Sequence, residues 1–229
     1  MPRLIALLLA LVPASVLVFP PAPAWSGAQV YEPLSASVQA ALHKAISDEV
    51  VPYLAFETVS KARAWLNAMS YKLAKRIPEP RVREELLVTV HYEAKRAGLD
   101  PQLVLGLIQV ESNFRKYAIS RAGARGFMQV MPFWTRLIGR PGDNLFHLRT
   151  NLRYGCVILR HYLDIEKGHY YRALGRYNGS LGQAEYPHMV VRAWHNDWHY
   201  PAHGVNPAAA GRSGEHAVER ASPTPSTMR

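Results

Sequence analysis

The most informative part of the sequence reads Asp100-Pro-Gln-Leu-Val-Leu-Gly-Leu-Ile-Gln-Val-Glu111-Ser-Asn-Phe114 and continues shortly afterwards as Gly123-Ala-Arg-Gly-Phe-Met-Gln-Val-Met-Pro132. Its first part is a strongly apolar, helix-like run that ends on an ionisable residue, Glu111. Asp100 can cap a helix through its carboxylate. Pro101 suits the first helical position, where its missing amide donor would be unpaired anyway. We therefore predict a helix from 101 to about 112.

Glu111 shares one helix face with the apolar stripe of this run, because residues three and four apart lie on the same side of a helix. A carboxylate that points toward the core is costly to ionise, so its pKa should rise unless a cation compensates. The alternative is an ordinary salt bridge to a nearby arginine. The apolar stripe consists of Leu103, Val104, Leu107 and Ile108. The nearby arginines are Arg115, Arg121 and Arg125.

The second part of the stretch favours a functional role for Glu111. Gly123 and Gly126 permit backbone conformations that other residues rarely adopt, and they let a ligand approach the chain closely. The following residues add apolar surface and one amide: Phe127, Met128, Gln129 and Met131. Alone, this segment is compatible with a tight turn before a helix. Beside an inward-facing glutamate, it predicts the wall of a cleft.

Apolar residues at helical spacing predict further helices along the chain. Two are expected between 35 and 76, separated by Pro52, and others over about 81–97, from 143 to about 165, from 171, and over 186–198. Asp143 is expected to cap the helix that it precedes. A turn over 176–180 is expected to present Tyr177 and Asn178 beside a glycine.

Composition divides the chain into four expected parts: a signal peptide (1–24), a linker and helical N-terminal extension (25–80), a main domain (81–200) and a disordered tail (201–229). Residues 4–18 are almost wholly apolar, and Ala22-Pro-Ala24 has the small-residue pattern of a cleavage site. A retained membrane anchor is the alternative, although Pro13 interrupts this short run. No stable membrane span is expected after signal cleavage. The tail lacks any apolar period.

The chain carries a formal net charge of +10, and the excess persists when the predicted signal and tail are left out. A basic surface favours anionic polymers, which outside the cytoplasm means peptidoglycan, teichoic acid or phospholipid head groups. No helix-turn-helix, zinc-finger or RNP-like signature accompanies the charge, so nucleic acid is not an expected partner.

Metal and thiol chemistry are not expected. The lone Cys156 has no partner for an intramolecular disulfide and is predicted to be a small buried hydrophobe. His195, His199 and His203 recur every four residues, but Pro201 interrupts them and no carboxylate or thiol completes a metal site. No nucleophile elbow or phosphate loop appears. We therefore predict neither a metal nor a cofactor.

Three motifs, taken in order, resemble those of the soluble, Slt-type (family 1) lytic transglycosylases, which are relatives of goose-type lysozyme. They are Glu111-Ser112, the segment from Gly123 to Pro132, and Tyr177-Asn178. The resemblance covers about 81–198 and implies a mainly α, lysozyme-like catalytic domain (the α+β lysozyme superfamily) with a helical N-terminal extension. Two departures are modest: Phe127 stands where leucine is usual, and Arg176-Tyr-Asn-Gly-Ser180 replaces Ala-Tyr-Asn-Ala-Gly.

The resemblance implies that Glu111 is the catalytic acid. Tyr177 falls where a tyrosine hydrogen-bonds the catalytic carboxyl. Ser112 is the motif neighbour of the acid, and Asn178 follows the tyrosine. Three positions that contact the sugar in this family correspond to Ser120, Gln129 and Met131.

The implied reaction needs one carboxyl. Ordinary glycosidases place two carboxylates across the bond, and only elimination suggests a second one here, among Asp143, Asp164 and Glu166. A single acid suffices if the muramic acid C6 hydroxyl attacks C1, which yields a 1,6-anhydromuramyl end. Peptidoglycan strands in the periplasm are then the expected partner, with proteins of an envelope or secretion machine as further candidates. A hydrolytic, goose-lysozyme-like muramidase and a non-catalytic glycan-binding scaffold remain open alternatives.

Overall fold

A computed structural model describes residues 28–47 and 50–201 of the chain. The predicted signal peptide lies outside the described residues, as does the predicted tail beyond residue 201. The described part contains helices and isolated β-bridges but no strand. The helices are α1 (Ala36–Ile46), α2 (Val59–Leu73), α3 (Pro80–Arg96), α4 (Pro101–Ser112), α5 (Phe133–Ile138), α6 (Leu148–Ile165), α7 (Tyr170–Asn178), α8 (Glu185–Arg192) and a π-helix, η1 (Ala193–Asp197). The mainly α class is thus confirmed.

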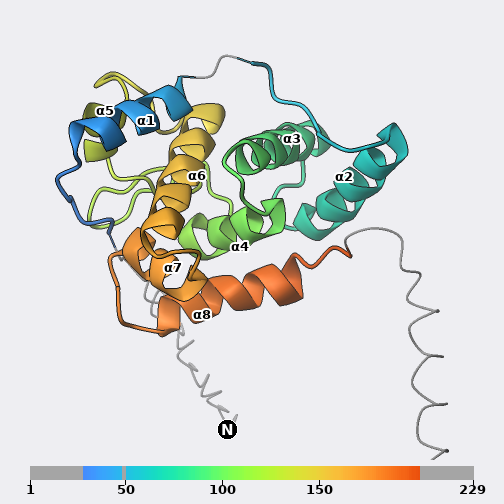
Figure 1. Ribbon diagram of the computed structural model, residues 1–229. Helices are drawn as coiled ribbons and strands as arrows, with labels where there is room; N and C mark the ends of the chain where they lie inside the picture. The colour runs from blue at the N-terminus through green and yellow to red at the C-terminus, as the bar shows by residue number, and fades with distance from the viewer. Residues whose placement is uncertain (1–27, 48–49, 202–229) are drawn as a thin grey trace, which may run out of the picture.

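Helix α4 occupies the centre of the molecule (Figure 1). It packs against α3 on one side and against α8 and η1 on the other, while α6 contacts both α3 and α7. The two helices of the N-terminal extension join this core at different places: α1 packs against α5 and α6, and α2 packs against α3. None of the described helices combines the length and the apolar character that crossing a bilayer requires.

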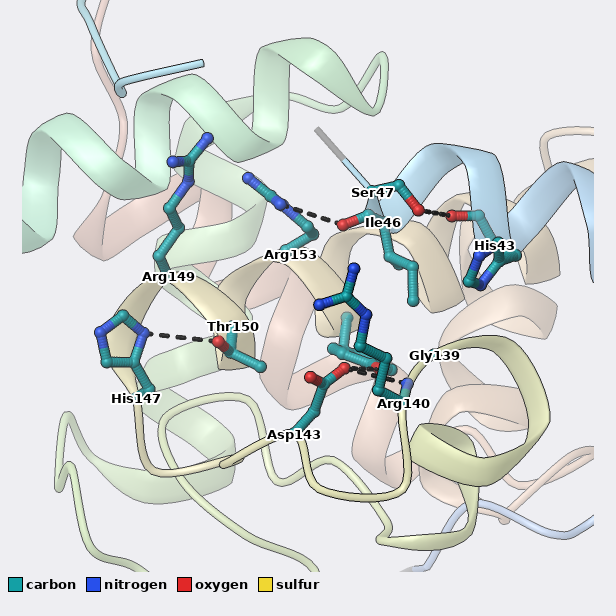
Figure 2. Close-up of a pocket in the computed structure, with 11 residues that line it drawn as sticks. His43, Ile46, Ser47, Gly139, Arg140, Asp143, His147, Arg149, Thr150 and Arg153 are labelled. Atoms are coloured by element: carbon teal, nitrogen blue, oxygen red, sulfur yellow. Dashed lines mark hydrogen bonds between the residues drawn. The ribbon is translucent and has the colours of Figure 1, made fainter. Parts of the chain in front are cut away.

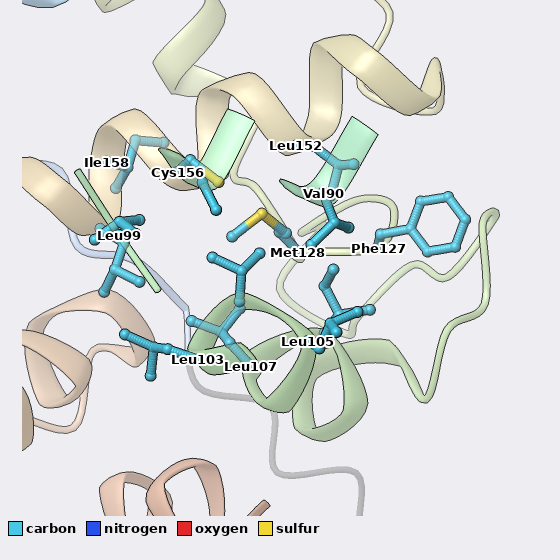
Figure 3. Close-up of a cluster of buried hydrophobic side chains, with 14 of the residues drawn as sticks. Val90, Leu99, Leu103, Leu105, Leu107, Phe127, Met128, Leu152, Cys156 and Ile158 are labelled. Atoms are coloured by element: carbon cyan, nitrogen blue, oxygen red, sulfur yellow. The ribbon is translucent and has the colours of Figure 1, made fainter. Parts of the chain in front are cut away.

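The core explains why the opening stretch organises the chain. The apolar stripe of α4 is fully buried, and side chains from α3 and α6 meet it (Figure 3). Met128, from the glycine-containing segment, is also fully buried and lies within this cluster. Cys156 is buried beside it, as predicted, and burial raises the pKa of its thiol. The second part of the stretch is therefore anchored in the same core as the first.

The ends of α4 follow the local sequence. The Asp100 carboxylate accepts a hydrogen bond from the amide of Gln102 over 2.8 Å, and Pro101 occupies the first turn, as predicted. Asn113 ends the helix in the left-handed conformation, with φ of 47°. The reversal at Asn113 stops the helix two residues beyond Glu111.

Two predicted boundaries differ from the structure. Asp143 does not cap α6, which begins at Leu148; it accepts instead from the Tyr154 hydroxyl (2.5 Å) and from the Arg140 amide (3.2 Å). Its carboxylate is used within the preceding loop. The predicted turn at 176–180 is also corrected, because α7 continues through Asn178 and reverses only at Gly179, where φ is +76°.

Candidate active site

Glu111 lies in the last turn of α4, with its side chain partly buried. The hydroxyl of Tyr186, from the first turn of α8, donates a hydrogen bond to Oε1 of Glu111 over 2.5 Å. Tyr186 is itself buried, so its ring is held by the core while its hydroxyl reaches the carboxyl. The packing of α8 on α4 therefore builds this contact.

The pKa of Glu111 is raised from its ordinary value of 4.5 to about 8. Burial is the main cause, and the hydrogen bond from Tyr186 opposes part of the rise. Within the described residues, no arginine forms an ion pair with this carboxyl; Arg115, for example, donates to the carbonyl of Ser112 over 3.0 Å. The structure therefore does not support the alternative of an ordinary salt bridge. A pKa of about 8 keeps the Glu111 carboxyl mostly protonated at neutral pH.

The predicted hydrogen bond from Tyr177 to the catalytic carboxyl is corrected by the structure. Tyr177 is fully buried, and its hydroxyl donates to the carbonyl of Met128 over 2.8 Å. A phenol has a single proton to donate, so the bond to Met128 leaves none for Glu111. Tyr186 makes the bond that the resemblance assigned to Tyr177. Tyr177 instead supports the glycine-containing segment through its hydrogen bond to Met128.

Ser112 joins the two parts of the opening stretch. Its side chain is buried, and its hydroxyl donates to the carbonyl of Phe127 over 2.7 Å. The residue next to Glu111 in the sequence is therefore tied to the segment that follows. This bond gives the Glu-Ser pair a physical role, since it sets the distance between the acid and the loop.

The segment from Gly123 to Met131 folds back on itself through isolated bridges between Ile119 and Arg125 and between Arg125 and Val130. Gly123 and Gly126 have φ of +88° and +76°, the region in which glycine is favoured, as their pattern predicted. A Cβ at Gly126 would also lie 2.6 Å from the carbonyl oxygen of Leu145, so that position has no room for a side chain.

Of the residues expected to contact sugar, Gln129 and Met131 lie on this folded segment and Ser120 lies just before it. The Gln129 amide donates to the carbonyls of Ala118 (3.1 Å) and Gly126 (2.9 Å), so it holds the loop together from inside. The Ser120 hydroxyl accepts from the amide of Ala124 over 3.1 Å, and Met131 is partly buried. Their contact with a sugar remains a prediction.

Asn178 and Asn151 are buried asparagines with contrasting environments. The side-chain amide nitrogen of Asn178 has no hydrogen-bond partner among the described residues. Asn151, from α6, is fully satisfied: it accepts from the Met128 amide (2.8 Å) and donates to the carbonyls of Arg125 (2.8 Å) and Leu145 (2.9 Å). Asn151 was not among the residues predicted from the sequence to support the site. The feature that could have identified Asn151 is a polar amide side chain within an otherwise apolar helical run.

The three candidates for a second carboxylate are each engaged elsewhere. Asp143 serves Tyr154 and lines a separate basic pocket of about 190 Å³, whose lining does not include Glu111 (Figure 2). Asp164 pairs with Arg160 over 2.6 Å. Glu166 binds Arg172 and Arg176, and these hydrogen bonds hold the pKa of its carboxyl below the ordinary value.

Metal ligation has no candidate cluster within residues 28–47 and 50–201, where no group of three or more histidine, cysteine, aspartate or glutamate side chains is placed to hold an ion. His195 lies in η1 and stacks on Trp194, with ring centroids 4.4 Å apart. His203 lies outside the described residues.

Comparisons with known proteins show similarity over the region that contains Glu111. Residues 89–188 match the family model described as the transglycosylase SLT domain. Membrane-bound lytic murein transglycosylase C of Mannheimia succiniciproducens is 32% identical over 140 residues, which cover 52% of this chain and 36% of that protein. The transglycosylase of Enterobacteria phage PRD1 is 34% identical over 98 residues, covering 43% of this chain and 36% of the phage protein.

A solved structure, an inactive mutant of the lytic transglycosylase Slt from Pseudomonas aeruginosa, matches 59% of this chain and 30% of its own, with 22% identity and a TM-score of 0.40. The chain spans only about a third of the length of the curated relatives described above. Glu111, the glycine-containing segment and Tyr177 all lie within the region that the family model matches. Residues 89–188 are thus similar to the transglycosylase SLT domain.

Proposed function

We propose that the chain is a peptidoglycan lytic transglycosylase, which cleaves the β-1,4 bond between N-acetylmuramic acid (MurNAc) and N-acetylglucosamine (GlcNAc) without consuming water. Glu111 donates its proton to the glycosidic oxygen, and the C4 hydroxyl of GlcNAc leaves. The Glu111 carboxylate then takes the proton from the C6 hydroxyl of MurNAc while that oxygen attacks C1. The new bond closes a 1,6-anhydro ring, and Glu111 ends protonated again.

The observation that carries the proposal is the setting of the Glu111 carboxyl, which accepts a hydrogen bond from Tyr186 and forms no ion pair within the described residues. A pKa of about 8 keeps the carboxyl protonated at neutral pH, as a general acid requires. The same value lies close enough to neutrality for the carboxylate to act as a base in the second step. Tyr186 occupies Oε1, so Oε2 is the oxygen that we assign to proton transfer.

The engagement of the other carboxylates favours transglycosylation over hydrolysis. Hydrolytic glycosidases generally use a second carboxylate, either to activate water or to form a covalent intermediate. Asp143, Asp164 and Glu166 each bind a partner of their own. A route in which the substrate supplies the nucleophile needs Glu111 alone. A goose-lysozyme-like muramidase is the alternative enzyme, and a glycan-binding scaffold is the alternative without catalysis.

The substrate places the enzyme outside the cytoplasm. We propose that residues 1–24 direct export as a signal peptide and that the enzyme acts in the periplasm on glycan strands; a retained N-terminal anchor is the alternative. The net charge of +10 suits an anionic wall polymer. Proteins of an envelope or secretion machine are proposed partners of the helical extension, and neither nucleic acid nor a cofactor enters the proposal.

Product analysis tests the reaction. Purified sacculi are digested with the wild type, with Glu111→Gln and with Glu84→Gln, a matched control on the exposed face of α3. The soluble products are separated and weighed by mass spectrometry. We expect anhydromuramyl ends from the wild type and the control, and a loss of at least about a hundredfold in rate for Glu111→Gln, the range that a general acid contributes.

Each other outcome selects a different function. Products heavier by one water would identify a hydrolase. Full activity of Glu111→Gln would remove Glu111 as the acid. If the wild type and the variant both bound sacculi and neither cleaved them, the chain would be a scaffold.

A further inference from the structure

Residues 28–32, which we call the N-terminal strap, precede α1 and begin beside α7 (Figure 1). They belong to the segment that composition marked as a linker. Within the strap, however, Gln29 is only 5% exposed. A long polar side chain is rarely buried in a linker, so its partners identify what the strap does.

Gln29 pairs with the backbone of the glycine-containing segment at two points. Its Oε1 accepts from the amide of Met131 over 2.9 Å, and its Nε2 donates to the carbonyl of Gln129 over 3.2 Å. The residue between them, Val130, pairs in the opposite direction: its amide donates to the carbonyl of Arg125 (3.0 Å), and its carbonyl accepts from the Arg125 amide (2.9 Å).

The backbone around Val130 is therefore paired on both sides, as in the middle of a sheet, although it forms only an isolated bridge. Successive backbone groups of an extended segment point to opposite sides, so Arg125 satisfies one edge and the Gln29 side chain satisfies the other. Without Gln29, the outward amide of Met131 and the outward carbonyl of Gln129 lose their partners. Gln129 also has a positive φ of 48°, which is costly for a residue with a side chain and must be held by its surroundings.

The rest of the strap fixes Gln29 in place. The carbonyl of Ala28 contacts Gly179 so closely that a Cβ at that glycine would collide with it. Tyr31 packs edge-on against Phe133, with ring centroids 5.6 Å apart. Arg176 donates to Glu32 over 3.1 Å. The strap thus spans from the end of α7 to the start of α5, across two of the three motifs.

Gln29 also acts on Tyr177. Burial raises the pKa of the Tyr177 phenol, and a hydrogen bond from the Gln29 side chain opposes that rise. Tyr177 in turn donates to the carbonyl of Met128. One side chain from the strap therefore contacts the segment 129–131 directly and its supporting tyrosine as well.

We infer that Gln29 is a positioning residue, which sets the backbone of 129–131 in the conformation that receives the sugar. This role rests on the proposed function, because Gln129 and Met131 are the positions expected to contact substrate. It assigns to the strap a share in building the substrate site. Gln29 itself acts through the segment and not on the reacting atoms.

Kinetics with glycan strands test the role in substrate binding. Gln29→Met keeps the length and volume of the side chain but removes both hydrogen bonds to the segment 129–131, together with the bond to Tyr177. Gln39→Met is the matched control in α1. We expect KM to rise about tenfold in Gln29→Met, the effect of losing two neutral hydrogen bonds, with kcat within about twofold of the wild type. Gln39→Met should match the wild type. An unchanged KM in Gln29→Met would overturn the inference, as would an equal fall in kcat, which points to general unfolding.

Amide hydrogen exchange tests the contact itself, independently of activity. We expect the Met131 amide to exchange at least about tenfold faster in Gln29→Met, while the Val130 amide, bonded to Arg125, keeps its protection. Equal protection of Met131 in both proteins would contradict the inference. Gln29→Glu retains the acceptor for Met131 and should restore that protection, which covers the case in which Gln29→Met folds poorly.

The two hypotheses fail in different ways. If the wild-type chain cleaves no glycan, the proposed function is wrong, and the dissociation constant for glycan strands replaces KM as the measure of the Gln29 effect. If the wild type cleaves glycan and Gln29→Met has the same KM and the same Met131 exchange, the positioning role alone is wrong.

Discussion

The hydroxyl of Tyr186 donates a hydrogen bond to Oε1 of Glu111 over 2.5 Å, and the two residues are 75 positions apart in the chain. Burial raises the pKa of this carboxyl to about 8, and the bond from Tyr186 limits the rise. The proton affinity of the proposed acid is therefore set by the packing of α8 on α4, which brings the phenol to the carboxyl.

Removing the Tyr186 hydroxyl should shift the pH dependence of cleavage. In the wild type, activity should decline as pH rises through about 8, because Glu111 then loses its proton. In Tyr186→Phe the bond that lowers the pKa is lost, so this decline should move to higher pH, and kcat should fall about tenfold. The measurement is kcat as a function of pH on soluble glycan strands.

Tyr177→Phe is the matched control for this shift. It removes the bond to the Met128 carbonyl, and the alkaline decline should stay where it is in the wild type. A shift in Tyr177→Phe together with none in Tyr186→Phe would restore Tyr177 as the partner of the acid.

Glu111→Gln should be more stable than the wild type at alkaline pH. The folded-state pKa, about 8, lies above the ordinary value of 4.5, so between these pH values the folded chain holds a proton that the unfolded chain has released. The stability of the wild type therefore falls as pH rises from about 4.5 to 8, and the neutral glutamine escapes this loss. The difference in unfolding free energy should approach zero at the acid end and be on the order of 5 kcal/mol above pH 8.

Denaturant unfolding at a series of pH values measures this difference. Glu84→Gln, on the surface of α3, should differ from the wild type by an amount that barely changes over the same range. If the difference for Glu111→Gln were equally flat, the burial of its carboxyl would not be costly, and the raised pKa would be wrong.

Alanine at the two loop glycines should have unequal effects. Both have positive φ, so either substitution costs about 1–2 kcal/mol of backbone strain. A Cβ at Gly123 meets nothing within 4 Å, whereas one at Gly126 would lie 2.6 Å from the Leu145 carbonyl oxygen and would also collide with Asn151. Gly126→Ala should therefore unfold at clearly lower denaturant than Gly123→Ala and lose most activity. Equal midpoints would show that the loop moves freely to accept the methyl group.

Asn151 should be a strong determinant of stability. Asn151→Ala leaves the Met128 amide and the carbonyls of Arg125 and Leu145 without their partner, which should cost about 3 kcal/mol or more. Glycan cleavage should also weaken, because Met128 anchors the segment beside Glu111. The control is Asn144→Ala, whose side chain accepts one exposed bond from the Phe146 amide and should cost under about 1.5 kcal/mol. Comparable losses in the two variants would contradict this role.

Local sequence predicted much of the fold. The start and end of α4, the inward direction of Glu111 and the positive φ of the two loop glycines depend on residues within a few positions, and all three are confirmed. The boundaries that differ have nonlocal causes. The local sequence favours Asp143 as a helix cap. In the structure, however, its carboxylate accepts a hydrogen bond from the hydroxyl of Tyr154. At Asp143, a tertiary hydrogen bond therefore outweighs the local preference of aspartate for the helix cap.

The partners of the site could not be predicted in the same way. The chain has 12 tyrosines, and the sequence offers no physical means of choosing which phenol reaches Glu111. The family resemblance implied Tyr177. In the structure, the Tyr177 hydroxyl donates to the carbonyl of Met128, and it is the Tyr186 hydroxyl that donates to Glu111. Gln29 looked like part of a linker because its partners, Gln129 and Met131, are 100 residues or more away.

Local sequence was therefore sufficient to predict a helical chain with an inward-facing glutamate, Glu111, beside a glycine-containing segment, because helix periodicity, capping and glycine conformation are local properties. Which groups surround that glutamate depends on contacts between distant parts of the chain. Tyr186, Asn151 and Gln29 come from three separate parts of the chain, and only the packing of α8, α6 and the N-terminal strap brings their hydrogen-bonding groups to the site.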